Sequence, residues 1–233
     1  MRTFAALLIK EEKAIFTSPI AYVVLSVFLI IMGYTFTLTL FVSHIPTLVH
    51  LFFQIYVLFL LTVPIITMRL VAEERRLRTI EILLTAPVSE PAVVFAKYLA
   101  SLSLVVLMLV LSGAYAITLG ILGQPDWGPI YSGYLGLFML GAALVAVGLT
   151  TSCLVNNQII AALLSLSLFL LLWIIDHFGW MLPDPFDALV VNLSLLVHFT
   201  PFATGSIFLS DAGFFISVTL LALFLSVRAL ARR

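Results

Sequence analysis

The sequence predicts an all-α, polytopic membrane protein with six transmembrane helices. Hydrophobic residues make up 63% of its 233 residues, and charged residues make up only 9%. The mean hydropathy of +1.25 is higher than the core of a soluble protein can absorb. Because about twenty apolar residues cross a bilayer as a helix, the lengths of the apolar runs set the number of spans. We expect a single transmembrane domain over residues 1–233.

Six apolar runs, separated by short polar breaks, define the expected spans. They cover residues 19–42, 47–68, 92–122, 129–154, 159–175 and 211–230. Before the first span, residues 1–17 have an apolar side that Glu11 interrupts, which predicts an interfacial helix along the membrane. Lys97, near the start of the third span, is expected to extend its ammonium group to the lipid headgroups.

The segment 176–210 fits neither a turn nor a span. Its apolar run, residues 186–199, is shorter than a span and contains several polar residues. We interpret the segment as a re-entrant pair of half-helices before the last span, with its polar side chains facing one another or an exit pathway. An amphipathic helix on the outer surface is the alternative. The candidate residues of an outer gate are Asn192, Ser194, His198 and Thr200.

The stretch 69–91 carries the densest charge in the chain. It contains four of the eleven Lys and Arg residues and four of the eleven Asp and Glu residues. Leucine and isoleucine recur among them at helical spacing, which predicts an amphipathic helix over residues 70–86 that ends at Pro87. A solvated loop that only fixes topology is the simpler alternative, but topology requires no interleaved Glu. We therefore interpret this stretch as a surface that binds a partner.

The distribution of charge predicts the orientation of the chain. All eleven Lys and Arg residues lie in residues 1–17, 69–97 and 228–233, and all five Asp residues lie in the segments on the other side. Since basic segments stay in the cytoplasm, both termini and the stretch 69–91 are expected there. Nothing near the N-terminus resembles a cleavable signal, so the first span is expected to be retained.

Several classes of function lack their sequence motifs. The chain has no G-x-x-x-x-G-K-[ST] phosphate loop, no H-E-x-x-H and no G-x-S-x-G, so we expect no nucleotide site and no catalytic residue in it. Cys153 is the single cysteine, which excludes a multi-cysteine metal site. No charged residue lies in the middle of a predicted span, and this argues against ion-coupled transport.

Four sequence words, together with the order of the spans, resemble those of ABC-2 type permeases. The words are SPIAYVVL (18–25), TVPIITMRLVAEERRLRTIEILLTAPVS (62–89), NNQIIAAL (156–163) and VHF (197–199). Within that class the chain resembles the gliding-motility-associated permeases. The resemblance extends over essentially the whole chain, and the word at 62–89 is its most specific part.

This resemblance implies a transmembrane subunit of an ATP-driven exporter in the bacterial cytoplasmic (inner) membrane. It also implies a connecting helix at 1–17, a coupling helix within 69–91 that docks into a separate ATPase, and re-entrant helices within 176–210. The implied partners are two cytoplasmic ATPase copies that bind ATP and Mg, a second copy of this permease or a related one, membrane lipid, and an extracytoplasmic auxiliary subunit. Nucleic acid is not an implied partner, and no cofactor is implied in this chain.

The residues expected to contact the ATPase follow from the charged stretch. Its coupling interface comprises Glu73, Glu74, Arg75, Leu77, Arg78, Ile80 and Glu81. The charged members would form charge-assisted hydrogen bonds with the ATPase, and the apolar members would pack beneath them, either on the bundle or in the cleft of the ATPase. A second, smaller coupling turn is expected between the fourth and fifth spans, at Asn156, Asn157 and Gln158.

Two other classes of function are open at this point. A membrane scaffold or assembly factor would use the same charged helix to recruit a soluble partner without transport. A secondary carrier or channel is the weaker alternative, because the spans lack charge at their centres. The cargo is also open, since uniformly apolar spans are compatible with lipid-linked, polysaccharide, peptide and drug-like substrates.

The predicted orientation is tested by cysteine labelling in whole cells. Gln124→Cys and Asp184→Cys are expected to react with a membrane-impermeant thiol reagent added from outside, because both positions lie on the predicted outer side. Arg76→Cys is expected to stay unlabelled. Labelling of Arg76→Cys from outside would contradict the orientation and the cytoplasmic location of the charged stretch together.

Overall fold

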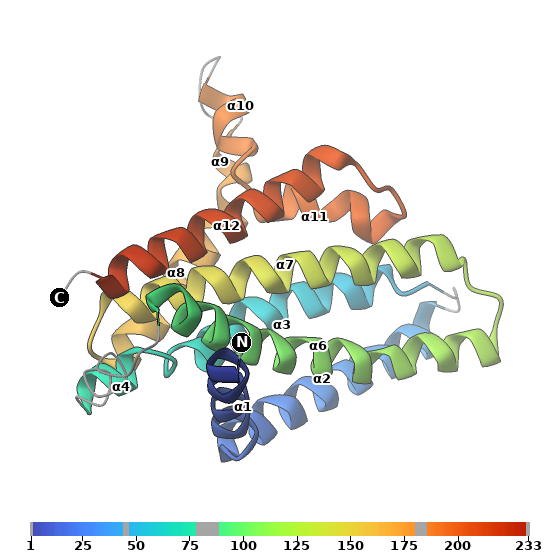
Figure 1. Cartoon of the computed structure of the whole chain (residues 1–233). Coiled ribbons are helices and arrows are strands. Elements are labelled where there is room, and N and C mark those ends of the chain that lie inside the picture. Colours follow the sequence, from blue (N-terminus) through green and yellow to red (C-terminus); the bar gives the residue numbers. More distant parts are fainter. Residues whose placement is uncertain (1, 44–46, 78–88, 180–185, 232–233) are drawn as a thin grey trace.

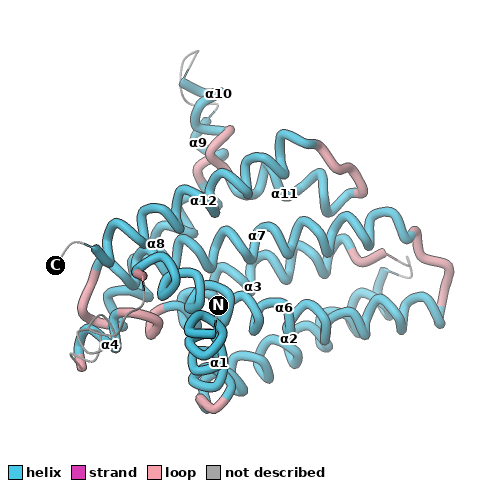
Figure 2. Tube along the Cα trace, in the orientation of Figure 1, coloured by secondary structure: helices cyan, strands magenta, loops and turns pink. Residues whose placement is uncertain are grey.

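Helices joined by short turns make up the described part of the chain. The computed structural model describes residues 2–43, 47–77, 89–179 and 186–231, and these ranges contain no strand. Figures 1 and 2 show the arrangement. In chain order the helices are α1 (Arg2–Phe16), α2 (Pro19–Ser43), α3 (Val49–Thr67), α4 (Ala72–Arg76), α6 (Glu90–Leu122), α7 (Trp127–Leu154), α8 (Gln158–Ile174), α9 (Asp176–Gly179), α10 (Phe186–Val191), α11 (Leu195–Thr204) and α12 (Leu209–Ala231).

The six predicted spans correspond to α2, α3, α6, α7, α8 and α12, with boundaries that agree to within two residues. Five of the helices are long and apolar enough to cross a membrane. The sixth, α8, has 17 residues and is about 25 Å long, which is less than the roughly 30 Å of a hydrocarbon core. The structure therefore confirms the predicted all-α, polytopic class.

Several helix ends follow from local sequence signals. Pro19 begins α2, where the missing N–H of proline leaves no hydrogen bond unmade. Asn157 caps α8, because its side-chain oxygen accepts a hydrogen bond of 2.9 Å from the Ile159 amide. Gly205 ends α11 with a φ of +103°, a left-handed conformation that glycine adopts without strain.

Helix α7 lies at the centre of the bundle and packs against α3, α6, α8, α11 and α12. Its glycines allow two of these helices to approach closely. A Cβ atom at Gly148 would lie 2.3 Å from Thr67 Oγ1 of α3, and one at Gly136 would lie 2.5 Å from the Cβ of Phe202 of α11. Small residues at such positions permit close packing of helices inside a membrane.

The predicted re-entrant segment divides into two parts. Helix α11 is inside the bundle, where Phe199 and Phe202 are fully buried and the Ser132 hydroxyl of α7 donates a 2.8 Å hydrogen bond to the Phe202 carbonyl. Helices α9 and α10 contact each other and stand away from the bundle (Figure 1). The re-entrant interpretation stays a prediction: α11 packs inside the bundle, whereas α10 stands away from the bundle with α9.

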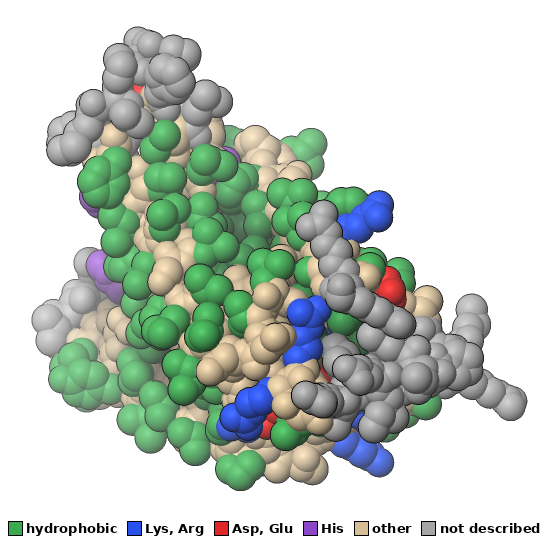
Figure 3. All heavy atoms as spheres, turned by 90° about the vertical axis from the view of Figure 1, so that its left-hand side faces the viewer, with side chains coloured by type: hydrophobic (Ala, Val, Ile, Leu, Met, Phe, Trp, Pro, Cys, Tyr) green, Lys and Arg blue, Asp and Glu red, His purple; other side chains and the backbone are tan. Residues whose placement is uncertain are grey.

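One end of the bundle carries the described Lys and Arg residues. Helix α1, helix α4, the start of α6, the turn before α8 and the end of α12 lie together at this end, on the left in Figure 1. Figure 3 looks at it directly and shows the blue basic side chains gathered there. The basic residues with described side chains in these elements or next to α4 are Lys10, Lys13, Arg69, Arg75, Arg76, Lys97 and Arg228. The opposite end holds Asp126, which precedes α7.

Candidate functional site

The candidate site is the short helix α4 with the side chains that hold it. Helix α4 has five residues, and its N-cap residue Val71 provides no side-chain cap. Its first amide groups would therefore lack partners within the helix. Ser152, at the end of α7, fills this role, since its hydroxyl oxygen accepts hydrogen bonds from the Val71 and Ala72 amides, both at 3.1 Å. The same hydroxyl donates to the Met68 carbonyl at 3.2 Å.

A second contact joins α4 to α12. The Arg75 guanidinium donates a 3.0 Å hydrogen bond from Nη2 to the carbonyl oxygen of Ala229. Ala229 lies in the last turn of α12, where carbonyl groups have no partner within the helix and interact favourably with a cation. Arg75 therefore fixes α4 to the end of the last span.

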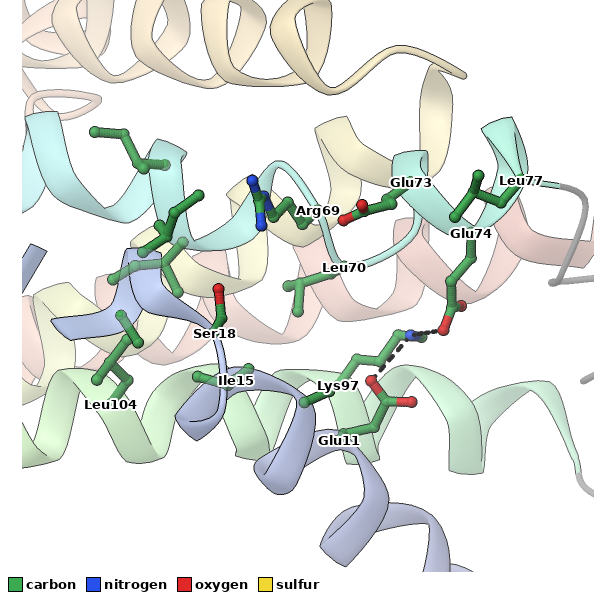
Figure 4. Close-up of a pocket in the computed structure, with 15 residues that line it drawn as sticks. Glu11, Ile15, Ser18, Arg69, Leu70, Glu73, Glu74, Leu77, Lys97 and Leu104 are labelled. Atoms are coloured by element: carbon green, nitrogen blue, oxygen red, sulfur yellow. Dashed lines mark hydrogen bonds and ion pairs between the residues drawn. The ribbon is translucent and has the colours of Figure 1, made fainter. Parts of the chain in front are cut away.

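A buried network of charges joins α4 to α1 and α6 (Figure 4). The Lys97 ammonium of α6 lies 3.1 Å from Glu11 Oε2 of α1 and 2.9 Å from Glu74 Oε1 of α4. Lys10 completes the network, at 2.9 Å from Glu11 Oε1 and 3.5 Å from Glu74 Oε1. We refer to α4 with Lys10, Glu11, Lys97, Ser152 and Ala229 as the α4 junction.

Lys97 corrects one expectation. The sequence predicted that its ammonium group would extend to the lipid headgroups, but Lys97 is only 1% exposed. The physical reason is that α1 packs on α6 and brings Glu11 over Lys97, so the chain supplies the counter-charge. A buried ion that loses one partner typically destabilises a protein by about 3–5 kcal/mol, so these contacts are strong constraints on the fold.

The network also alters the acidity of Glu11. Burial by itself raises the pKa of this carboxyl group, but the charge of Lys97 and the hydrogen bond from Lys10 outweigh burial. The pKa of Glu11 is therefore lowered from its ordinary value of 4.5. Ionised Glu11 is the form that the fold stabilises.

The predicted coupling residues differ in their surroundings. Glu74 and Arg75 point into the α4 junction instead of presenting their charge to a partner. Leu70 is 6% exposed, whereas Leu77 is 58% exposed, so the two do not share a buried side as the amphipathic pattern predicted. The reason is that α4 ends at Arg76 and Leu77 is its C-cap residue. The other predicted contacts, Arg78, Ile80 and Glu81, lie outside the described residues.

The structure also places Glu73 and the predicted second coupling turn, residues 156–158. Glu73 lines a cavity beside the α4 junction (Figure 4). Asn156 and Asn157 are exposed, and Gln158 is half-buried at the start of α8. Helix α8 contacts α4, so the turn that precedes it lies at the same end of the bundle as the α4 junction.

The four residues predicted for an outer gate do not converge. Ser194 caps α11 by accepting hydrogen bonds from the Leu196 and Val197 amides, at 3.2 and 3.4 Å. His198 Nδ1 lies 2.8 Å from Asp211 Oδ1, and its Nε2 lies 3.1 Å from the Asn192 carbonyl oxygen. The side chains of Asn192 and Thr200 are exposed. Ser194 and His198 thus hold α11 in place, and Asp184 of the predicted outer side lies outside the described residues.

The sequence did not predict the residues that hold α4 on its inner side. Lys10, Glu11, Lys97 and Ser152 were not among the predicted site residues, although two of them carried a signal. Glu11 interrupted the apolar side of residues 1–17, and Lys97 was a single cation near an apolar span. Two opposite charges of this kind, each placed where a charge is costly, are candidates for pairing with each other. In the described ranges no group of His, Cys, Asp and Glu residues could hold a metal ion.

Comparison with known proteins gives the family. A family model described as an ABC-2 family transporter protein matches residues 53–200, which is more than half of the chain. The chain belongs to the ABC-2 transporter family. No curated protein matches it. Membership of this family makes the chain a membrane-embedded transport subunit and not a catalytic enzyme. Within the α4 junction of this ABC-2 transporter, the matched range includes α4, Lys97 and Ser152, whereas α1 and α12 lie outside it.

Acidification is expected to weaken the α4 junction. Because the pKa of Glu11 is lowered from 4.5 in the folded state, its ionised form stabilises the fold at neutral pH, and this contribution is lost as the pH falls below about 4.5. Glu11→Gln is expected to melt at a lower temperature than wild type at about pH 7. The further decrease between about pH 5 and about pH 3 should be smaller in the variant than in wild type.

Thermal unfolding of the detergent-purified protein measures both effects. Glu12→Gln is the matched control, because Glu12 is the next residue of α1 and its side chain does not take part in the network. This control should keep the acid dependence of wild type. The same acid dependence in wild type and Glu11→Gln would contradict the role given to Glu11.

Proposed function

We propose that this ABC-2 family chain is the permease subunit of an ATP-driven exporter, and that α4 is the helix through which a separate ATPase drives it. The observation that carries the proposal is the way α4 is held. Contacts from α1, α6, α7 and α12 fix its inner side, while Arg76 and Leu77 at its C-terminal end are exposed. A helix with these properties can receive a displacement at one end and transmit it to four others.

The transmission would be a rigid-body movement. Ser152 connects α4 to the central helix α7, and Arg75 connects α4 to α12, so neither helix can stay in place if α4 moves while these contacts persist. Packed helices have discrete arrangements, and a small displacement at one site can shift them between two of these. Such a shift would alternate the access to a pathway through the bundle.

The contact with the ATPase is proposed to centre on Arg76 and Leu77. An exposed leucine beside an arginine, beyond the end of α3, has the character of an interface anchor. Arg78, Ile80 and Glu81 remain predicted contacts, and Asn156, Asn157 and Gln158 remain a predicted second contact. Glu74 and Arg75 would act by positioning α4, since their charged groups already have partners within the chain.

The finer assignments belong to the same proposal. The chain would lie in the bacterial inner membrane with both termini in the cytoplasm and would resemble the gliding-motility-associated permeases. Two ATPase copies, which bind ATP and Mg, would assemble with two permease chains, and an extracytoplasmic subunit would complete the transporter. The charge at one end of the bundle supports the cytoplasmic location of α4.

Substitution of the exposed end of α4 tests the proposal. The double variant Arg76→Glu with Leu77→Asp is expected to weaken binding of the cognate ATPase at least about tenfold, because truncating an interface anchor typically has an effect of this size. Co-purification of the ATPase and its transport-stimulated ATP hydrolysis are the two measurements. The double variant Arg76→Lys with Leu77→Met keeps the charge and the apolar volume and should behave as wild type.

Two outcomes would contradict the proposal in different ways. Wild-type ATPase binding and hydrolysis in the charge-reversed variant would show that α4 is not the coupling contact. An ATPase that binds the wild-type chain but never couples hydrolysis to transport would favour the scaffold hypothesis.

A further inference from the structure

A cavity of about 310 Å³ lies beside the α4 junction (Figure 4). Its volume is at the lower end of the roughly 300–1,000 Å³ that is typical of small-molecule sites. Apolar residues of α1, α2, α3 and α6 form its walls, among them Ile15, Ile20, Ile65 and Leu104. Ile65 is 39% exposed on a membrane-spanning helix, so the apolar part of the cavity is accessible from lipid.

The polar end of the cavity contains a donor without a partner. Arg69 Nε is buried and has no hydrogen-bond partner in the described part of the chain. A buried donor that makes no hydrogen bond is costly, and the cost is larger when the group is charged. Glu73, which lines the same end, forms no ion pair with Arg69 in the structure, where the described pairs are those of the Lys97 network and of His198 with Asp211. An oxygen of a bound molecule would satisfy Arg69.

The charges at this end define what such a molecule must carry. Lys10 and Lys97 are matched by Glu11 and Glu74, so the network is neutral by itself. Arg69 and Glu73 are left, with one positive and one negative charge toward the cavity. The complementary ligand is therefore an amphiphile whose polar end has an anionic and a cationic group close together.

We propose that this cavity binds a zwitterionic membrane lipid with a primary ammonium group, of the phosphatidylethanolamine class. Its phosphate oxygen accepts the hydrogen bond from Arg69, and its ammonium group donates to Glu73. An acyl chain lies along the isoleucines of α1, α2 and α3.

The cavity lining favours a primary ammonium group over a quaternary one. Proteins recognise quaternary ammonium groups with aromatic side chains, and no Phe, Tyr or Trp is among the described residues that line this cavity. Glu73 instead offers an oxygen acceptor, which an N–H donor can use and a trimethylammonium group cannot. The proposal depends on the membrane location of the chain and not on the coupling role of α4.

Lipid titration of the purified, delipidated chain tests the assignment. Native mass spectrometry would compare phosphatidylethanolamine, phosphatidylcholine and phosphatidylglycerol with the same acyl chains. Phosphatidylethanolamine is expected to bind about tenfold more tightly than the other two, and Arg69→Gln is expected to remove most of this advantage. Glu73→Gln, which keeps an oxygen acceptor but loses the charge, should reduce the preference over phosphatidylcholine.

Lys13→Gln and Glu12→Gln are the matched controls. Both are neighbouring charged residues of α1 that do not line the cavity, and both should bind lipid as wild type does. Equal phosphatidylethanolamine binding in wild type, Arg69→Gln and Glu73→Gln would overturn the proposal, as would a preference for phosphatidylglycerol. A photo-crosslinking phosphatidylethanolamine needs no variant, and crosslinks that map only to helices that do not line the cavity, such as α7, α8, α11 and α12, would also overturn it.

Discussion

A buried ammonium group constrains the cytoplasmic-facing architecture that we propose for this ABC-2 transporter. Lys97 is 1% exposed, so its charge is tolerated only with carboxylates in contact. Its two partners come from different helices, Glu11 from α1 and Glu74 from α4. Helices α1 and α4 must therefore both stay against α6 for the charge to remain paired. A single residue in a membrane-spanning helix thus fixes the position of two helices outside the apolar runs.

The remaining contacts of α4 extend this constraint through the bundle. Ser152 satisfies the first amides of α4 from the end of α7, and α7 in turn packs on α3, α6, α8, α11 and α12. A five-residue helix has little stability of its own, so its position depends on these partners. This dependence is what makes α4 suited to coupling, because a helix that is positioned by the bundle also acts on the bundle when it is displaced. The lipid site proposed beside it would fill the remaining space between α1 and α3.

The sequence predicted the membrane spans but not the residues that hold the inner side of α4, and both outcomes have physical reasons. Long apolar runs determine the spans, and prolines and caps such as Asn157 determine several ends, since both signals are local. The partners of α4 are remote: Ser152 is 80 residues from Ala72, and Lys97 is 86 residues from Glu11. The orientation of Glu74 depends on those partners and not on the helical spacing of residues 70–86. That spacing placed Glu74 toward a partner and Leu77 on one side with Leu70, whereas Glu74 contacts Lys97 inside the bundle and Leu77 is exposed while Leu70 is buried.

Amide hydrogen exchange tests most directly whether the Lys97 network holds α4 on the bundle. The Arg75 and Leu77 amides donate the hydrogen bonds within α4, to Val71 and Glu73, both at 2.9 Å, and report on its local opening. In Lys97→Met, these amides are expected to exchange faster than in wild type, because Glu74 loses its buried partner, while the amides at the centre of α7 keep their protection. Unchanged exchange in α4, or an equal loss of protection throughout the bundle, would contradict the account.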